Sequence, residues 1–441
     1  MTNPPSRNQA LYRQARARVP GGTHLFSKRP ELFAPGCWPA YFESAAGCRV
    51  RDIDGNEYLD FAHNGVGACL LGYAHPEVNA AVHARIGAGV ACSLNPPEEV
   101  ELAARLCAIH PWAERVRLAR GGGEACAMAV RIARAATGRD IVAVCGYHGW
   151  HDWYLAANLG EEDALAGHLL PGLAPAGVPQ SLRGTTLAFH YNDLEEFQAV
   201  LDRAGNRLAA VVMEPCRHHD PAPGFLEAIR DKTHAAGALL VFDEVTIGWR
   251  LCFGGAHLRL GVAPDMAVFS KALGNGFPIA AVIGSAAAME SAQNSFLSST
   301  VWTEAVGPAA GLATLEVMER HDVAGHAAWI GDQVTAVWRT AAERHALPVE
   351  VGEGYPCLAT FSFQHEEATV LRTLFTRKML ERGFLAGAAF YPTLAHTHRD
   401  VEQYAKAADI VFAELRGVLD AGPAADALDG PPAHEGFARL T

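Results

Sequence analysis

Two short apolar runs in the middle of the chain end in residues that could do chemistry together. Leu239–Phe242 is followed by Asp243, and Met266–Phe269 is followed closely by Lys271. Both runs have the length and composition of strands buried in a parallel sheet. Ligands of open α/β sheets bind outside the carboxyl ends of the strands. The sequence therefore predicts a carboxylate and an amine at the same sheet edge, where a small molecule could bind.

This pairing has a specific chemical use. An amine in a partly desolvated pocket loses its proton more readily and can attack an aldehyde to form a Schiff base. A carboxylate beside a pyridine nitrogen keeps that nitrogen protonated, and the two together are the protein signature of pyridoxal phosphate chemistry. Taken alone, the pair favours a plainer interpretation, in which Asp243 caps a helix or lies at the surface and Lys271 is solvated.

The elements around this pair predict an α/β fold. Strand-like and helix-like segments alternate from about residue 115 to 285, which is typical of a mostly parallel sheet covered on both faces. The two ends of the chain read as a smaller α+β domain. We expect residues 1–75 and 325–441 to form the two parts of the small domain, and 76–324 to form the large one. The loop-like segment 158–183 is a candidate lid, and the last twenty residues are expected to be poorly ordered.

A glycine-rich turn precedes one of the predicted helices. Gly121, Gly122, Gly123 and Glu124 lie between a short predicted strand and an alanine-rich helix that ends at Gly138. Unshielded backbone N–H groups at a helix start can bind an anion, although a plain tight turn is the alternative. The pattern lacks the third glycine of a dinucleotide fingerprint and the Gly-Lys-Ser/Thr of a P-loop.

A second motif, Tyr147-His148-Gly149-Trp150-His151-Asp152, follows the predicted strand Ile141–Cys145. An aromatic residue at a strand end can stack on a flat ring. His148, His151 and Asp152 could instead be read as metal ligands, but no known metal-binding pattern supports this, so no metal is expected.

The composition excludes several classes of function. The chain has 441 residues with a net charge of −12, from 36 basic and 48 acidic side chains, which argues against nucleic acid or an anionic membrane as a partner. Ten cysteines occur without a CxxC pair, which is typical of a reducing compartment. Because no apolar run is long enough to span a membrane and the first residues lack a signal-peptide core, a cytoplasmic protein is expected.

The order of these motifs resembles the class III aminotransferases, which are fold type I pyridoxal phosphate enzymes, and is most similar to their glutamate-1-semialdehyde aminomutase branch. The resemblance extends over about residues 10 to 420. Its best-matching pieces are VPGG (19–22), DIDGNEYLDF (52–61), GEACAMAVRIARAATGR (123–139), YHGWHD (147–152), GFLEAIR (224–230), GALLVFDEV (237–245), APDMAVFSKALGNGFP (263–278) and LAHTHRDVEQY (394–404).

The resemblance implies a role for each matching residue. Lys271 forms the Schiff base with the cofactor and moves the proton, and Asp243 pairs with the pyridine nitrogen. Tyr147 and Val245 contact the two faces of the ring. The phosphate is bound by the N–H groups of two glycines, Gly122 and Gly123.

Two further roles are implied by the same resemblance. Thr300, in SSTVWTE, matches the threonine that completes the phosphate site of the neighbouring subunit, so a homodimer is expected. Glu214 is expected near the ring hydroxyl or the incoming amino donor.

Departures from the family pattern bear on the reaction. The phosphate turn usually reads Ser-Gly-Thr, so two hydroxyls are missing here. In the aminomutases, a serine and an arginine of the N-terminal loop hold the substrate carboxylate, whereas this chain has Leu25 and Lys28. Val66 stands where an aromatic residue is expected. We expect His24, Lys28, Val66 and Trp302 to line the substrate pocket together with the lid.

The sequence thus predicts a pyridoxal phosphate-dependent aminotransferase that moves an amino group from an amino-acid donor to an aldehyde or ketone. The acceptor implied by the resemblance is a sugar, an aminocyclitol or another biosynthetic intermediate. Two alternatives stay open: an isomerase on the same cofactor, either a 2,1-aminomutase or an epimerase, and a non-catalytic scaffold that kept the fold.

Overall fold

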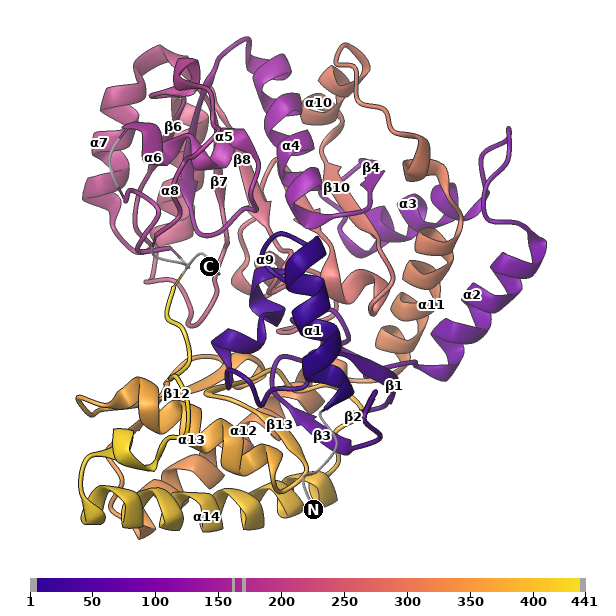
Figure 1. Ribbon diagram of the computed structural model, residues 1–441. Coiled ribbons are helices and arrows are strands. Elements are labelled where there is room, and N and C mark those ends of the chain that lie inside the picture. The colour runs from indigo at the N-terminus through magenta and orange to yellow at the C-terminus, as the bar shows by residue number, and fades with distance from the viewer. Residues whose placement is uncertain (1–5, 161–162, 169–171, 437–441) are drawn as a thin grey trace. The chain divides into compact units, whose positions relative to one another are not determined.

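A computed structural model describes residues 6–160, 163–168 and 172–436 (Figure 1). Two compact units make up the chain. One is Pro76–Ala324, and the other joins Met1–His75 with Gly325–Thr441.

The Pro76–Ala324 unit is built on a seven-stranded sheet with the order β4-β10-β9-β8-β7-β5-β6. β5 to β9 run parallel to one another, and β10 is antiparallel to both β4 and β9. This confirms the predicted α/β class with a mostly parallel sheet. The strands are β4 (Arg115–Ala119), β5 (Ile141–Cys145), β6 (Thr186–Ala188), β7 (Leu208–Met213), β8 (Leu239–Asp243), β9 (Met266–Phe269) and β10 (Ala280–Gly284).

Helices cover both faces of this sheet, because its strands are apolar on both sides. On one face α4 packs in a core with Val144, Val212 and Val268; on the other, α7 and α8 pack in a core with Val211 and Phe242. The helices of the unit are α2 (Pro76–Ala88), α3 (Glu98–Ile109), α4 (Gly122–Thr137), α5 (Asp152–Leu155), α6 (Ala157–Gly160), α7 (Leu194–Ala204), α8 (Phe225–Ala235), α9 (Ala256–Leu260), α10 (Ala286–Met289) and α11 (Val306–Arg320).

The end of α4 shows how the local sequence sets an element. Gly138 adopts a left-handed conformation at φ +66° and donates its N–H to the carbonyl of Arg134, as the sequence predicts for a glycine C-cap. Alanines at 125, 129 and 133 keep the buried face of α4 thin, so the helix lies close to the strands. The glycine turn at its other end is thereby held against the sheet.

The other unit contains two small sheets, β1-β2-β3-β13 and β11-β12-β14. Phe61 lies at the centre of its core and stacks on Tyr404, with ring centroids 4.4 Å apart, and on Phe390, at 5.0 Å. The elements are α1 (Arg7–Arg18), β1 (Phe42–Ala46), β2 (Arg49–Asp52), β3 (Glu57–Phe61), α12 (Val323–Arg344), β11 (Val349–Val351), β12 (Ala359–Phe363), α13 (Ala368–Leu380), β13 (Phe384–Ala386), β14 (Ala389–Phe390) and α14 (His398–Ala421).

Two segments differ from the sequence-based expectation, the first helix and the C-terminal tail. The sequence favours a helix over residues 11–19, but α1 begins at Arg7, because the side chain of Ser6 accepts the N–H of Gln9 and caps it. The expectation of a poorly ordered tail is wrong for residues 424–436: Ala433 is buried and its N–H donates to Thr373. The predicted lid, 158–183, contains the end of α6 and a short 3₁₀ turn at Gln180–Leu182, while residues 161–162 and 169–171 lie outside the described part.

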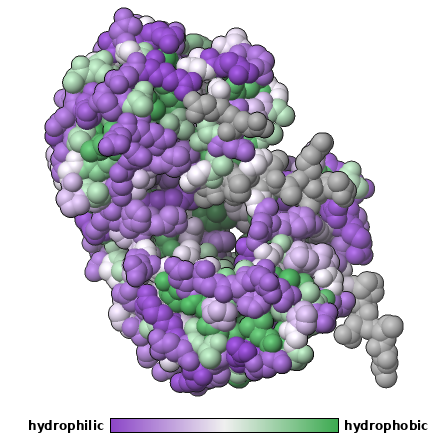
Figure 2. All heavy atoms as spheres, turned by 90° about the vertical axis from the view of Figure 1, so that its left-hand side faces the viewer, coloured by the Kyte–Doolittle hydropathy of each residue, from purple (hydrophilic) through white to green (hydrophobic). Residues whose placement is uncertain are grey.

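No helix within the described ranges is both long enough and apolar enough to cross a membrane. The face of the molecule in Figure 2 is largely hydrophilic, with hydrophobic side chains in scattered patches.

Candidate active site

Four of the predicted site residues follow the ends of adjacent parallel strands. β9, β8, β7 and β5 lie side by side in the sheet. In that order their carboxyl ends lead to Lys271, Asp243, Glu214 and Tyr147. The structure thus brings these residues to one edge of the sheet, where the sequence places a ligand.

Asp243 is buried and held by three donors. Its Oδ2 lies 2.8 Å from Nδ1 of His148 and 3.3 Å from Sγ of Cys126, and its Oδ1 accepts the N–H of Val245 at 3.0 Å. Burial is the main reason why the pKa of the Cys126 thiol lies well above its usual range, so the thiol keeps its proton and can donate it to the carboxylate. These contacts fix the direction of the carboxylate.

Lys271 lies at φ +44°, in the left-handed region that a residue with a side chain rarely adopts. Its Nζ donates a hydrogen bond to Oγ1 of Thr246 at 2.9 Å. Its pKa is lowered to about 8, mainly by burial and then by the positive charges of Arg217 and Arg250, against the opposing charge of Glu214. The amine is thus far easier to deprotonate than an ordinary lysine.

Glu214 is part of a fixed ion pair. Nη1 of Arg217 lies 2.9 and 3.1 Å from the two carboxylate oxygens, one of which also accepts the N–H of Tyr147 at 3.2 Å. Gly146 permits this approach, because a Cβ there would lie 2.6 Å from Oε2 of Glu214. The backbone and the arginine together hold the carboxylate in place.

The glycine turn forms the first turn of α4, with Gly121 as its N-cap. The side chain of Glu124 accepts the N–H groups of Arg120 and Gly121, at 3.0 and 3.4 Å. A Cβ on Gly122 would lie 2.9 Å from Cγ1 of Val245, so a side chain at 122 would require Val245 to shift. Gly122 and Gly123 therefore present backbone N–H groups at a helix start beside the loop that follows Asp243, which suits an anion.

The remaining predicted site residues are spread over both units. Trp302 and Thr300 lie in the short 3₁₀ segment Thr300–Thr303, where Thr300 is exposed. The carbonyl of Trp302 accepts a hydrogen bond from Arg120 at 2.9 Å, so this segment is tied to the residue before the glycine turn.

His24, Lys28 and Val66 lie in the unit that contains the two chain ends, where His24 and Lys28 are exposed. Val66 is half-buried and lies at φ +57° within a turn that has several left-handed residues. Their predicted contact with substrate stays a prediction.

Sequence reasoning missed three residues of this arrangement. Cys126 and His148 lie in recognised motifs, but only the packing of α4 and the loop after β5 against β8 brings them to Asp243. Arg217 follows Glu214 by three residues, and that charge spacing was the only signal in the sequence. The two histidines of the second motif do not face a common point: His148 contacts Asp243, while His151 lies beside Gly123. This argues against the interpretation of His148 and His151 as ligands of one metal ion.

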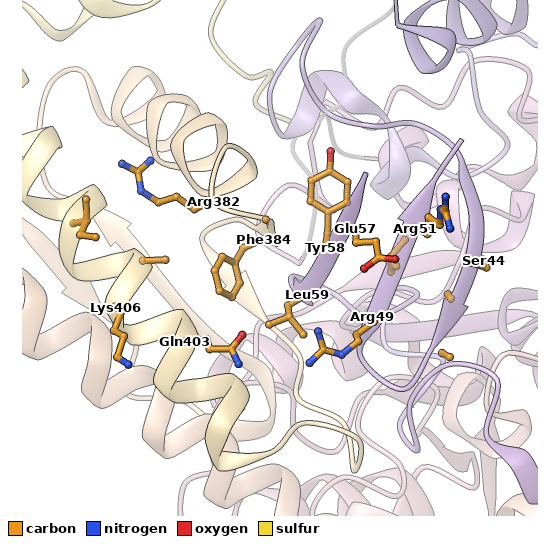
Figure 3. A pocket seen from close by; sticks show the side chains of 16 residues that line it. Ser44, Arg49, Arg51, Glu57, Tyr58, Leu59, Arg382, Phe384, Gln403 and Lys406 are labelled. Carbon is orange, nitrogen blue, oxygen red and sulfur yellow. The ribbon is translucent and has the colours of Figure 1, made fainter. Parts of the chain in front are cut away.

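A separate groove of about 750 Å³ lies within the unit that contains the chain ends, between α14 and the sheet with β2 and β3 (Figure 3). Four basic residues line it: Arg49, Arg51, Arg382 and Lys406. The three arginines pair with acidic residues, among them Asp400 for Arg49 and Glu414 for Arg382. None of the predicted site residues lines this groove.

The residues at the sheet edge fit pyridoxal phosphate. The cofactor needs an amine for its aldehyde, a carboxylate for its pyridine nitrogen and N–H donors for its phosphate. Lys271, Asp243 and the Gly122–Gly123 turn offer these groups around one strand edge. In addition, Nε2 of His148 is buried without a hydrogen-bond partner among the described residues, which leaves a polar group at the site to be satisfied.

Comparisons with known proteins agree with this fit. Residues 35–398 match the family model described as Aminotransferase class-III. A 3-aminobutyryl-CoA aminotransferase from Cloacimonas acidaminovorans (strain Evry) is 32% identical over 406 residues, which cover 90% of this chain and 93% of that protein. A glutamate-1-semialdehyde 2,1-aminomutase from Pelotomaculum thermopropionicum is 34% identical over 432 residues, with 92% and 97% covered.

Solved structures show the same fold. The FumI protein of Sphingopyxis sp. MTA144, in its PLP internal aldimine form, has a TM-score of 0.85 at 25% identity and covers 95% of this chain and 98% of its own. The expected family, the fold type I architecture and the pyridoxal phosphate cofactor are thereby confirmed. The chain belongs to the class III aminotransferases, a family of pyridoxal phosphate enzymes.

Proposed function

We propose that this enzyme transfers an amino group from an amino-acid donor to an aldehyde or ketone acceptor in two half-reactions. The observation that carries the proposal is the arrangement of Lys271 and Asp243 on adjacent strand ends, with the lysine pKa lowered to about 8. A sugar, an aminocyclitol or another biosynthetic carbonyl compound is the proposed acceptor class.

The protein residues divide the work. When bound, the cofactor supplies an aldehyde that condenses with amines and a ring that accepts the electron pair left by a departing proton. Lys271 is placed to take that proton at Nζ and to return it, because its lowered pKa makes the neutral amine available near neutral pH. Asp243, fixed by His148 and Cys126, is placed to balance positive charge on the ring nitrogen.

The proposed assembly is a homodimer in which Thr300 serves the phosphate site of the neighbouring subunit. Two observations support it. Thr300 is exposed on its own subunit, and the residues beside it include the exposed apolar side chains of Phe296 and Val301, which are 87% and 57% exposed. Exposed apolar side chains of this size commonly mark a surface that another protein covers.

The second candidate is an isomerase that uses the same cofactor, a 2,1-aminomutase or an epimerase. Relatives that carry the name glutamate-1-semialdehyde 2,1-aminomutase favour it, at 32–34% identity. Leu25 and Lys28 weigh against it, because they replace the serine and arginine expected to hold the aminomutase substrate. A lysine is a poorer carboxylate clamp than an arginine.

The test is an absorbance titration of the purified holoenzyme with L-glutamate, L-glutamine and L-alanine, one at a time. A transaminase loses its visible cofactor band with one donor, releases one equivalent of the matching oxo acid, and recovers the band when a carbonyl acceptor is added. Turnover of a single compound with no separate donor would instead identify the isomerase. Lys271→Ala should abolish both reactions while the protein still folds.

A further inference from the structure

The ion pair between Glu214 and Arg217 lies at the strand edge where the substrate reacts. β7 lies between β5 and β8 in the sheet, so the loop after β7 opens between Tyr147 and Asp243. The Glu214 and Arg217 side chains are only 7% and 18% exposed. Arg217 contacts Glu214, and Glu214 accepts the N–H of Tyr147, so this guanidinium is close to the reacting centre. Burial lowers the pKa of Lys271 most, and the positive charge of this guanidinium lowers it further.

The guanidinium is also held rigidly. Nη1 of Arg217 contacts both oxygens of Glu214, and Glu214 is itself anchored by the N–H of Tyr147 and the close approach of Gly146. A fixed, partly buried guanidinium binds a planar anion well, because its N–H groups match carboxylate geometry and little side-chain entropy is lost.

We propose that Arg217, held by Glu214, binds the carboxylate of the amino donor and so makes the first half-reaction selective for amino acids. The inference rests on the proposed transamination and names the residue that would decide its substrate class. It places the carboxylate-binding cation in the loop after β7, whereas the N-terminal loop that has this role in the aminomutase branch carries Leu25 and Lys28.

The first experiment compares two pairs of amines in which an uncharged amide of similar shape replaces the carboxylate: L-alanine with L-alaninamide, and L-glutamate with its α-carboxamide. For each variant we measure kcat/KM of the first half-reaction and take the ratio of acid to amide. Both members of a pair react through Lys271, so a change in the protonation of this lysine cancels in the ratio.

Arg217→Gln should lower this ratio roughly 10- to 100-fold, the effect of losing a hydrogen bond between charged groups. The acid-to-amide ratio of Arg217→Lys should lie between those of the wild type and Arg217→Gln, because lysine keeps the charge and lacks the planar arrangement of N–H groups. Arg230→Gln is the matched control, since Arg230 pairs with its neighbour Asp231 on α8, and it should keep the wild-type ratio.

A second readout needs no turnover. Propionate carries a carboxylate and no amine. Bound at Arg217, it would offset the positive charge near Lys271 and raise the pH midpoint of the visible band of the holoenzyme. The wild type should show this shift and Arg217→Gln should not.

An unchanged acid-to-amide ratio in Arg217→Gln, or a propionate shift that survives in this variant, would overturn the inference. The inference would also be overturned if Lys28→Gln lowered the acid-to-amide ratio and Arg217→Gln did not. Failure of the proposed function looks different: the wild type would turn over none of the amines, and the propionate titration would still decide the role of Arg217.

Discussion

At the scale of single residues, Lys271 sets a pH dependence. Only its neutral amine attacks an aldehyde, and its pKa is lowered from 10.5 to about 8 by burial and the nearby arginines. The rate at which the cofactor-free protein forms its Schiff base with pyridoxal phosphate should therefore rise with pH, with a midpoint near 8, and then level off. Stopped-flow absorbance across this range measures it. A midpoint near that of free lysine would contradict the burial of this amine.

The same shift affects folding. Between about pH 8 and 10.5 the unfolded chain keeps a proton on Lys271 that the folded, cofactor-free protein has released. Because stability rises with pH wherever the unfolded state binds more protons, the free energy of unfolding of the cofactor-free protein should increase with pH across that window through this one group.

Cys126 gives a second prediction at this scale. Its thiol lies 3.3 Å from Oδ2 of Asp243 and is one of the donors that hold the carboxylate. Removing a weak donor of this kind costs about 1 kcal/mol, so Cys126→Ala should weaken cofactor binding about fivefold. Cys126→Ser should restore part of the affinity, because a hydroxyl can also donate.

The control for this prediction is Cys357→Ala, which removes another fully buried thiol from the other unit. Equilibrium dialysis of pyridoxal phosphate against the three variants separates the loss of a hydrogen bond to Asp243 from the loss of packing by a buried thiol. Equal losses of cofactor affinity in Cys126→Ala and Cys357→Ala would mean that Cys126 acts only through packing.

At the scale of elements, the turn from His63 to Gly67 carries local strain. Asn64, Gly65, Val66 and Gly67 all have positive φ, and the N–H of Gly67 donates to the carbonyl of His63 at 2.7 Å. This is one turn of left-handed helix, which costs a residue with a side chain roughly 1–2 kcal/mol. Backbone strain of this kind is concentrated at functional sites. It is therefore consistent with the prediction that Val66 contacts the substrate.

Val66→Gly should consequently raise the melting temperature or leave it unchanged, because glycine adopts φ +57° freely. Val66→Ala keeps the strain and loses packing, so it should melt lower than the wild type. The control is Val50→Gly in β2, an ordinary strand position, which should be clearly destabilised. If Val66→Gly were the least stable of the three, packing by Val66 would outweigh its strain.

The elements also show what the sequence could predict. The apolar runs before Asp243 and Lys271 predict two buried parallel strands. The first polar residues after such strands lie at the carboxyl edge of the sheet, so the sequence also predicts where the carboxylate and the amine lie. The glycine C-cap at Gly138 is equally local. The contacts of Asp243 with Cys126 and His148 are not local, because they depend on how α4 and the loop after β5 pack against β8.

Other features stayed hidden for similar reasons. The pairing of Arg217 with Glu214 depends on the path of a loop, and the conformation of Val66 contradicts the preference of its residue type. The tail at 424–436 reads as disordered from its Ala, Gly and Pro content, yet it packs because Thr373 and Glu31 accept the N–H groups of Ala433 and His434.

At the scale of the whole molecule, the Pro76–Ala324 unit exposes apolar side chains on two segments that meet. Leu94 and Val100 are 78% and 68% exposed, and Phe296 is more exposed still. The segments join where the N–H of Ala305 donates to the carbonyl of Val90 at 2.9 Å. A second copy of the chain would cover such a surface in a symmetric dimer, and sedimentation should give twice the mass of the chain.

A mixing experiment tests whether Thr300 serves the neighbouring site. Lys271→Ala has no catalytic amine, and Thr300→Ala should bind the cofactor roughly 10-fold more weakly through the loss of a hydrogen bond to phosphate. In a mixed dimer, one site loses both residues and the other keeps both, provided that Thr300 acts across the interface. Unfolding and refolding the two variants together at limiting cofactor should then restore activity to about half the wild-type level per mixed dimer. If Thr300 acted within its own subunit, every site would stay defective and mixing would restore nothing.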